Sequence, residues 1–392
     1  MKKRVMVSAD YYSPGFKAGG AVRSLANIMG RLGDRLDFSI VTRNHDLGDA
    51  EPYPGIEADT WLKQGPLTLY YARRSSALFW KVHRAIRGKR TDVLYLNSFF
   101  SPAFTIFPLL MRRLGAGAAP LVVLAPRGEL TVGALGMKRA KKRAFLALGK
   151  VLGLYRGVRF QASSEMEASD IRREIGSAAL VSVAVDLPIP GAQAPPRTRR
   201  KKRDALRAVV VTRAARNKNL VGALQILAGM DLPVEFDIFG PIEDRAYWEE
   251  CRRVIATSLA AVVRHRGPLR PDAVVPALAD YDLFFLPSLG ENFGHVILEA
   301  LLAGCPVLLS DRTPWRDLEA EGVGWSFPLG DPSLFRQALE SAYRMDGETY
   351  QGFVERARAY AQTHLRAEQA ELANLNLFGG GTQARNVESM AL

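Results

Sequence analysis

The chain has 392 residues, of which 48% are hydrophobic and 24% are charged, so it is long enough for two domains that each bury their own core. Its two cysteines, Cys251 and Cys305, exclude a disulfide framework and are typical of a protein of the reducing cytoplasm. The longest apolar stretch, Phe99–Leu110, is too short to span a bilayer. The formal net charge of +13 indicates an anionic partner.

The first half of the chain alternates strand and helix patterns. The expected strands are Arg4–Ser8, Phe38–Thr42, Leu67–Tyr71, Val93–Asn97, Leu121–Ala125 and Val158–Gln161. The expected helices between them are Val22–Leu32, Leu78–Arg87 and Phe104–Leu114. The basic start of the chain carries only a short apolar run, which predicts the first strand and not a signal peptide. Alternating strands and helices predict an α/β fold with a parallel, doubly wound sheet.

A second strand–helix series follows a stretch without periodicity, Ile189–Arg203, which predicts a linker. Its expected strands are Ala208–Val211, Glu235–Phe239, Val262–Arg266, Asp282–Pro287 and Val307–Ser310. Its expected helices are Leu220–Met230, Ala246–Leu259, Asp272–Ala279, Val296–Ala303 and Tyr350–Phe378. We therefore expect a domain at 1–195, a linker at 196–205 and a second domain at 206–365.

Two clusters hold much of the positive charge. Lys138–Arg143 opens an amphipathic helical pattern, which suits an anionic membrane surface. Arg197–Arg203 follows a proline-rich stretch and is interpreted as a solvated linker. Simple solvation is the alternative for the first cluster as well. Nucleic acid is the competing partner for both, but no recognition motif supports it, so no nucleic-acid binding is predicted.

Two carboxylates, Glu291 and Glu299, stand eight residues apart across a transition from loop to helix. A helix N-terminus presents free N–H groups and partial positive charge, so it suits a phosphate. Glu299 lies roughly 10 Å further along the helix axis, so the two carboxylates fit the two ends of a sugar nucleotide. The alternative is a surface helix with two solvated glutamates. It is disfavoured because Glu299 interrupts an apolar run, where a carboxylate requires partners.

Cations and glycines follow the first strand of each half. Arg213 and Lys218 come five residues apart after the strand Ala208–Val211, where two cations can neutralise a diphosphate. A basic helix cap is the alternative. Gly19 and Gly20 follow the first strand of the chain but do not form a G-x-G-x-x-G fingerprint, which disfavours a dinucleotide. An ordinary glycine loop before a helix is the alternative there.

The region around the two glutamates resembles the E-x7-E motif of retaining glycosyltransferases of family 4, the glycosyl transferases group 1. The matching residues are Glu291, Phe293, Gly294, Glu299, Ala300, Gly304 and Pro306. The resemblance implies the GT-B fold, in which two Rossmann-like doubly wound domains face a central cleft. It assigns the acceptor to the first domain and the nucleotide sugar to the second. It also implies that helix 366–378 packs back on the first domain, while the tail 379–392 is expected to be disordered.

The same resemblance assigns roles to individual residues. It implies that Glu291 faces the donor sugar, that Arg213 and Lys218 stabilise the departing diphosphate, and that Glu299 binds ribose hydroxyls. The remaining donor-binding residues that it implies are Gly19, Gly20, Gly240, Asn292, Phe293, Gly294 and His295.

One family feature is missing. Many relatives place a histidine at the end of a later strand of the first domain, but here those strands lead into Asn97-Ser98 and Arg127-Gly128-Glu129. The candidates for orienting an acceptor hydroxyl are therefore His45, Asp46, Arg127 and Glu129, and spacing does not choose among them.

A metal or cofactor is not predicted. Asp280-Tyr281-Asp282 matches D-x-D in letters only, and its position at a buried strand start indicates a structural role. His265 and His295 lack metal-ligand spacing.

The sequence thus predicts a retaining, metal-independent glycosyltransferase with a nucleotide-sugar donor and a saccharide acceptor. The basic helix favours a polyprenyl- or otherwise lipid-linked acceptor at the cytoplasmic face of the plasma membrane, as in exopolysaccharide or O-antigen assembly, and a soluble acceptor is the alternative. The rival functions are an epimerase or phosphorylase on the same fold, and an inactive relative that binds membranes or partners.

Overall fold

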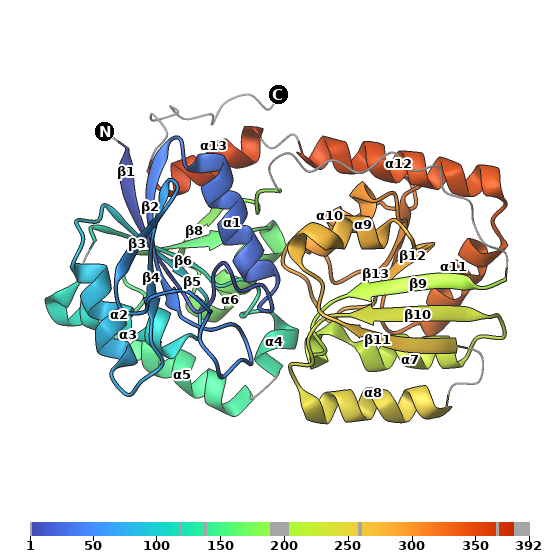
Figure 1. Ribbon diagram of the computed structural model, residues 1–392, viewed down its shortest axis with the longest axis horizontal. Helices are drawn as coiled ribbons and strands as arrows, with labels where there is room; N and C mark the ends of the chain where they lie inside the picture. The colour runs from blue at the N-terminus through green and yellow to red at the C-terminus, as the bar shows by residue number, and fades with distance from the viewer. Residues whose placement is uncertain are drawn as a thin grey trace. The chain divides into compact units, whose positions relative to one another are not determined.

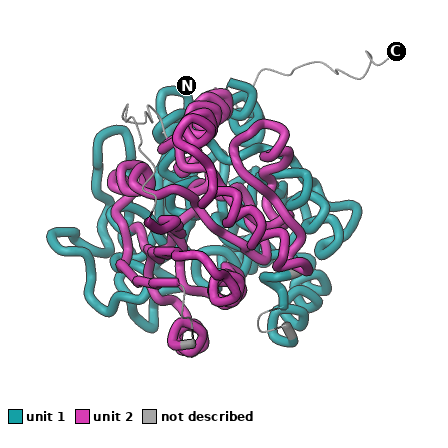
Figure 2. Tube along the Cα trace, turned by 90° about the vertical axis from the view of Figure 1, so that its right-hand side faces the viewer, with its two compact units in different colours: residues 1–15, 21–190, 367–392 teal, residues 16–20, 191–366 magenta. Residues whose placement is uncertain are grey.

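The computed structural model describes residues 2–117, 119–136, 139–188, 204–257, 261–365 and 368–379. The chain divides into two compact units (Figure 2). Unit 1 comprises residues 1–15, 21–190 and 367–392, and unit 2 comprises residues 16–20 and 191–366. The expected domain 1–195 is therefore interrupted by the short segment 16–20, which groups with unit 2. Apart from residues 204 and 205, the expected linker 196–205 lies outside the described residues, as does the basic run Arg197–Arg203.

Unit 1 is built on an eight-stranded sheet with the order β3-β4-β2-β1-β5-β6-β7-β8 (Figure 1). Its strands are β1 (Lys3–Ala9), β2 (Leu36–Arg43), β3 (Trp61–Gln64), β4 (Leu67–Ala72), β5 (Val93–Asn97), β6 (Leu121–Ala125), β7 (Val158–Ala162) and β8 (Leu180–Val183). Its helices are α1 (Gly20–Leu32), α2 (Leu78–Arg87), η1 (Pro102–Ile106), α3 (Phe107–Met111), η2 (Arg112–Ala116), α4 (Val132–Gly136), α5 (Arg139–Val151), α6 (Glu165–Ile175) and α13 (Glu368–Leu377). All strand pairs are parallel except β3 with β4.

Both faces of this sheet are covered, which explains why its central strands are continuous apolar runs. Side chains alternate between the two faces of a strand. In β1, Val5 and Val7 pack in the core that includes α1 and α13, whereas Met6 packs in the core that includes α2 and η1. The edge strand β3 was not predicted, because its sequence WLKQ is only partly buried and carries no apolar run.

Unit 2 is built on a six-stranded, fully parallel sheet with the order β11-β10-β9-β12-β13-β14. Its strands are β9 (Leu206–Val211), β10 (Val234–Phe239), β11 (Ala261–Gly267), β12 (Leu283–Leu286), β13 (Val307–Ser310) and β14 (Gly324–Phe327). Its helices are η3 (Arg216–Lys218), α7 (Leu220–Ala228), α8 (Arg245–Thr257), η4 (Pro271–Ala273), α9 (Val274–Leu278), α10 (His295–Leu302), α11 (Pro332–Arg344) and α12 (Gly347–Leu365). Each unit therefore has the Rossmann-like character that the sequence predicts.

The C-terminal region 350–378 forms two helices in the described part of the chain. Helix α12 belongs to unit 2 and packs against α10. Helix α13 belongs to unit 1, where Phe378, which follows it, lies edge-on to Tyr95 with ring centroids 5.2 Å apart. Residues 380–392, which include nearly all of the expected tail, lie outside the described residues. None of the helices in the described ranges is long and apolar enough to cross a membrane.

Candidate active site

Two neighbouring strands of unit 2 bring the predicted donor-site loops together. Strand β9 leads into η3, and β12 leads into the loop before α10. Because β9 and β12 pair in parallel, their carboxyl ends meet at the same edge of the sheet, where α/β proteins bind ligands. Asn219, in the left-handed conformation with φ of 54°, donates its side-chain amide to Pro287 O at 3.0 Å. The backbone N–H of Leu289 donates to Asn217 O at 2.9 Å, so the two loops are bound to each other.

Two of the three predicted catalytic residues of these loops, Lys218 and Glu291, form an ion pair. Lys218 Nζ lies 2.7 Å from Glu291 Oε1, and the two side chains are 15% and 9% exposed. The backbone N–H of Glu291 donates to Arg312 O at 3.0 Å, which fixes the start of the loop before α10. A lysine ammonium and a carboxylate held together in a largely dry site are suited to binding a charged, hydroxyl-rich ligand.

The other cations of the β9–α7 loop have acidic partners. Arg213 pairs with Glu243, and both side chains are about one third exposed. Arg216 pairs with Glu250 and lies over the Tyr247 ring, with its guanidinium carbon 5.2 Å from the ring centroid. Arg216 is thus tied to α8, so it is a matched control for experiments on Lys218.

Gly240 is required by the backbone at the end of β10. Its φ is +137°, and a Cβ at this position would lie 1.9 Å from Thr212 O. The backbone N–H of Thr212 donates to Phe239 O at 2.7 Å. The glycine therefore lets β9 and β10 approach closely where the Arg213 loop begins.

The start of α10 is held by an aromatic residue that the sequence analysis did not assign. Gly294 has a φ of +77°, and a Cβ there would lie 2.7 Å from Ile297 Cδ1. Trp315 donates its indole N–H to Phe293 O at 2.7 Å. Phe293 contacts His295 edge-on, with ring centroids 4.8 Å apart. A tryptophan after a polar turn gives no sequence pattern that would mark this role.

Glu299 and His295 lie on α10 itself. His295 is its first residue and is 7% exposed, and Glu299 is 2% exposed. Glu299 stands about 6 Å further along the helix axis than His295. Asn292, in the preceding loop, is partly buried. The glutamate pair of the E-x7-E motif is therefore removed from bulk water.

The glycine pair of the first half lies at the start of α1. Gly19 has a φ of +70°, and its N–H donates to Phe16 O at 3.0 Å. Gly20 is the first residue of α1. Both belong to the segment 16–20 that groups with unit 2.

Two of the acceptor candidates follow β2. His45 is 7% exposed, and its Nδ1 lies 3.1 Å from Asp46 O. Asp46 Oδ1 accepts a hydrogen bond from the backbone N–H of Leu47 at 2.7 Å. His45 Nε2 is buried and has no hydrogen-bond partner in the described part of the chain. A neutral or protonated imidazole with one uncommitted nitrogen can still bind a ligand hydroxyl.

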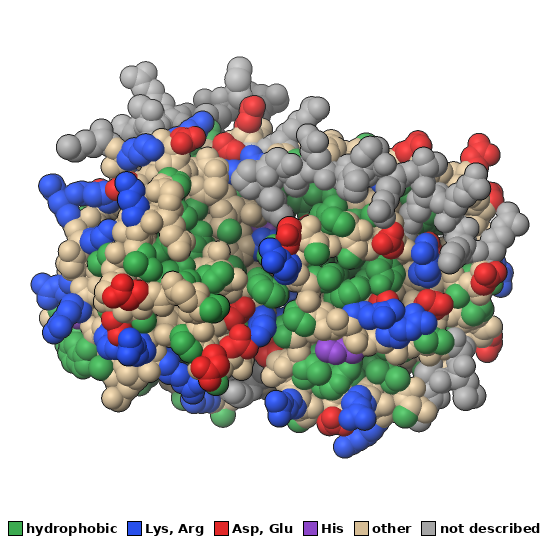
Figure 3. Space-filling model, in the orientation of Figure 1, with side chains coloured by type: hydrophobic (Ala, Val, Ile, Leu, Met, Phe, Trp, Pro, Cys, Tyr) green, Lys and Arg blue, Asp and Glu red, His purple; other side chains and the backbone are tan. Residues whose placement is uncertain are grey.

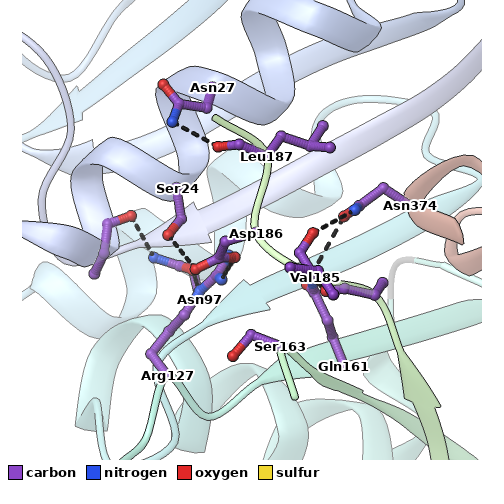
Figure 4. Close-up of polar contacts among 12 residues, drawn as sticks. Ser24, Asn27, Asn97, Arg127, Gln161, Ser163, Val185, Asp186, Leu187 and Asn374 are labelled. Atoms are coloured by element: carbon purple, nitrogen blue, oxygen red, sulfur yellow. Dashed lines mark hydrogen bonds and ion pairs between the residues drawn. The ribbon is translucent and has the colours of Figure 1, made fainter. Parts of the chain in front are cut away.

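Arg127 lies in a buried polar network (Figure 4). It donates to Asn97 Oδ1 and to Tyr95 Oη, both at 2.7 Å, and it pairs with Asp186. Burial lowers the pKa of the Arg127 guanidinium, but Asp186, Tyr95 and Glu167 together outweigh that effect and the net shift is upward. Ser24 Oγ donates to Asp186 at 2.7 Å. Each of the three guanidinium nitrogens thus has a hydrogen-bond partner inside unit 1.

Glu129 is also committed to the interior. It accepts hydrogen bonds from Ser98 Oγ and from the backbone N–H groups of Phe99 and Phe100, all at 2.8 Å. Burial raises the pKa of the Glu129 carboxyl. Strands β1 and β5 separate the end of β2 from the end of β6, a span of about 14 Å, so the structure does not bring the four acceptor candidates together.

The D-x-D letters have the structural role expected from their position. Asp282 is 1% exposed in its side chain and pairs with Arg207, whose Nη2 lies 3.1 Å from Asp282 Oδ1. The backbone N–H of Arg207 also donates to Asp282 at 2.9 Å. Within the ranges that the structure describes, no group of three or more His, Cys, Asp or Glu side chains is arranged to hold a metal ion.

Comparison with known sequences identifies the second half of the chain. Residues 195–360 match the family model described as glycosyl transferases group 1. This region is a group 1 glycosyltransferase domain. The phosphatidyl-myo-inositol mannosyltransferase of Mycobacterium leprae is 34% identical over 100 residues, which cover 25% of this chain and 27% of that protein.

Solved structures resemble nearly the whole chain. HepE of Anabaena, in complex with UDP and glucose, has 16% identity and a TM-score of 0.68, covering 95% of this chain and 98% of that one. Sucrose-phosphate synthase of Thermosynechococcus elongatus has 16% identity and a TM-score of 0.70, covering 96% and 98%. WaaG, described as a glycosyltransferase involved in lipopolysaccharide biosynthesis, has 16% identity and a TM-score of 0.62, covering 96% and 100%. These similarities confirm the GT-B fold.

Proposed function

We propose that this protein transfers a sugar from a nucleotide-sugar donor to a saccharide acceptor, with retention of configuration and without a metal. The observation that carries the proposal is the largely buried Lys218–Glu291 pair at the joined ends of β9 and β12, inside the region that matches group 1 glycosyltransferases. HepE, which has the same fold, is described as binding UDP and glucose, which makes a UDP-sugar the first donor to test.

In this proposal the cations replace a metal at the leaving group. Lys218 and Arg213 neutralise the diphosphate as the bond from sugar C1 to the phosphate oxygen breaks and the electron pair leaves with the phosphate. A hydroxyl oxygen of the acceptor forms the new bond to C1, and its proton passes to the departing diphosphate. Glu291 orients the donor sugar, and Glu299 binds the ribose hydroxyls. Exclusion of water limits hydrolysis of the donor.

The remaining predicted donor contacts form the surroundings of this pair. Asn292, Phe293, Gly294 and His295 lead into α10, whose N-terminus favours phosphate, while Gly240 shapes the turn beside Arg213. Gly19 and Gly20, which have no side chain, are proposed to let the backbone at the start of α1 lie close to the same donor.

The acceptor is proposed to be a lipid-linked saccharide in the assembly of a cell-surface polysaccharide. Two proteins that resemble this chain have names that support this class: one acts on phosphatidyl-myo-inositol and the other is involved in lipopolysaccharide biosynthesis. The expected membrane contact is the basic cluster Lys138–Arg143, of which Lys138 lies outside the described residues and Arg139 opens α5. His45, with its uncommitted Nε2, is the preferred acceptor contact among the four candidates.

A thermal-shift screen of UDP-, GDP- and ADP-sugars tests the donor proposal. One nucleotide class should stabilise the wild type by about 2.7 kcal/mol at a donor concentration of about 100 times Kd. At the same donor concentration, the stabilisation should fall to about 0.4–1.4 kcal/mol in Lys218→Met and should also fall in Glu299→Ala. It should persist in Arg216→Met, because Arg216 is tied to Glu250. The proposal is wrong if every donor leaves the melting temperature unchanged, or if Arg216→Met reduces the shift as much as Lys218→Met does.

A further inference from the structure

The positive charge of this protein is concentrated in one part of unit 1. Between Thr60 and Ser164 the sequence holds 19 lysines and arginines but only two carboxylates, Asp92 and Glu129, a formal charge of +17. The whole chain carries +13, so the rest of the protein is slightly acidic. This segment therefore produces a strongly positive surface on an otherwise balanced molecule.

Neither carboxylate of the segment neutralises the positive charge of this surface. Asp92 pairs with Arg4, whose Nη2 lies 2.6 Å away, and Glu129 is buried with three hydrogen-bond donors. From outside the segment, Asp59 contributes an ion pair with Lys81 at 2.6 Å. The arginines that remain exposed around α2 include Arg74, Arg84, Arg87 and Arg90.

Large apolar side chains are exposed on the same elements. Trp80 on α2 is 61% exposed, Leu114 on η2 is 67% exposed and Val151 at the end of α5 is 83% exposed. The other exposed members of this set are Phe79, Leu148 and Leu152. We call these six residues, with the arginines and lysines around them, the α2–α5 face.

The elements that carry this face are joined in the structure. Phe107, the first residue of α3, contacts Trp80 with ring centroids 5.2 Å apart. Helix α3 continues directly into η2. Arg113 of η2 donates to Leu152 O at 3.2 Å, beside the end of α5. Helices α2, α3 and α5 follow one another along the same side of unit 1 (Figure 1). Near the place of α2, Figure 3 shows hydrophobic side chains next to Lys and Arg side chains.

We propose that the α2–α5 face docks unit 1 onto an anionic lipid bilayer, with Trp80 and Val151 inserted at the headgroup level. Tryptophan favours the membrane interface, exposed aliphatic side chains gain from contact with acyl chains, and the surrounding cations bind acidic headgroups. Cations with aromatic rings also suit nucleic acid. The exposed aliphatic residues Leu114, Leu148 and Val151 favour the bilayer, because they offer nothing to phosphates or bases.

This surface extends beyond the basic cluster Lys138–Arg143, since it adds α2 and η2 and assigns the inserted side chains. The proposed docking rests on the proposed function in one respect: its role would be to bring a lipid-linked acceptor to the enzyme. Binding to lipid requires neither donor nor acceptor. A failure to bind vesicles would therefore leave the donor site intact, and a failure to bind donors would leave the docking face intact.

Vesicle co-sedimentation of the full chain at low salt tests the proposal. The wild type should sediment with phosphatidylcholine vesicles that contain phosphatidylglycerol, but not with phosphatidylcholine alone, and added salt should release it. Trp80→Ser combined with Val151→Ser should weaken this binding about tenfold or more. Leu372→Ser, on α13, is the matched control because Leu372 is also exposed, and it should bind like the wild type.

Tryptophan fluorescence gives a second readout. Anionic vesicles should shift the wild-type emission to shorter wavelengths, and Trp80→Ser should remove that shift. Each variant is first shown to melt like the wild type, so that unfolding cannot imitate lost binding. The proposal is overturned if the double variant binds vesicles as well as the wild type does. Binding to a single-stranded RNA homopolymer, without binding to anionic vesicles, would also overturn it.

Discussion

Replacing Asp186 by alanine should leave the buried guanidinium of Arg127 in unit 1 without its carboxylate partner. Arg127 and Asp186 are 8% and 3% exposed in their side chains, and Asp186 is the only carboxylate that pairs with Arg127 within the described residues. The pair links the loop after β6 to residues 184–188, which precede the interdomain segment. Asn27 donates to Leu187 O at 2.7 Å, and Asn374 of α13 donates to Val185 O at 2.9 Å, so the same region also holds α1 and α13 (Figure 4).

The expected cost follows from these contacts. Removing one partner of a buried ion pair lowers the free energy of unfolding by about 3–5 kcal/mol, because the remaining charge stays buried without an opposite charge beside it. The hydrogen bond from Ser24 Oγ to Asp186 is lost as well, which adds about 1 kcal/mol. Asp186→Ala should therefore cost about 4–6 kcal/mol. The double variant Arg127→Met with Asp186→Ala should recover at least about 2 kcal/mol of this, because the buried guanidinium is removed together with its partner.

Hydrogen exchange along a urea titration measures the loss of stability separately for unit 1 and unit 2. Peptides from β7 and α13 should lose protection at lower urea in Asp186→Ala, while peptides from α10 in unit 2 serve as the internal reference. The reasoning is refuted if Asp186→Ala costs under about 1 kcal/mol, or if the double variant is no more stable than the single one. Transfer activity retained in the double variant would also exclude Arg127 as an acceptor contact.

Three further predictions concern single sites. Gly240→Ala should destabilise unit 2 by about 2–4 kcal/mol in thermal unfolding, because its Cβ would meet Thr212 O at 1.9 Å. Lys218→Met should weaken UDP binding about 10–100-fold in calorimetry. Glu291→Gln should bind UDP at least as well as the wild type, because Lys218 no longer pairs with a carboxylate, but it should lose sugar transfer. Burial raises the pKa of Glu129 above 4.5, so the folded state binds more protons than the unfolded state just above that pH. Stability from this group is therefore greatest at low pH and falls as pH rises through the raised pKa, and Glu129→Gln should lack this slope in melting temperature against pH.

Strands that are buried on both faces could be predicted from the sequence almost to the residue. Val93–Asn97, Leu121–Ala125 and Val307–Ser310 have the predicted bounds, because an uninterrupted apolar run fits only the middle of a covered sheet. Strand β14 (Gly324–Phe327) was not predicted, because its sequence GWSF has no run of its own. Its identity depends on pairing with β13, where a Cβ on Gly324 would lie 2.0 Å from Val307 O.

The helix predicted at Phe104–Leu114 forms three short segments. Ser101 Oγ accepts from the backbone N–H of Phe104 and so starts η1 at Pro102. Pro108 has no amide hydrogen, which interrupts the regular hydrogen-bond series at the start of α3. The apolar spacing predicted the buried face but not these changes of helix type, because helix type depends on which hydrogen bonds the individual backbone groups form.

The sequence proposes the donor-site residues one by one, but it does not predict which of them form pairs. Lys218 and Glu291 are 73 residues apart, and they meet only because β9 and β12 are neighbours in the sheet. Trp315, which holds the turn before α10, gives no pattern in the sequence. Asp186 is a single carboxylate in an extended segment, so the sequence does not reveal that Arg127 has a buried partner.

Lys218 and Arg127 show why burial alone does not distinguish a binding group from a structural one. Both are largely buried cations at the carboxyl end of a parallel sheet, and both pair with a carboxylate. Arg127 donates hydrogen bonds from Nε and from both terminal nitrogens, to Asn97, Asp186 and Tyr95. A ligand could therefore bind Arg127 only by breaking hydrogen bonds inside unit 1. An ammonium group has three donors, and Lys218 directs one of them to Glu291. A diphosphate can therefore take up the remaining donors without breaking the fold. The Lys218 side chain is also the more accessible of the two, at 15% exposed against 8% for Arg127, and this access favours Lys218 as the functional cation.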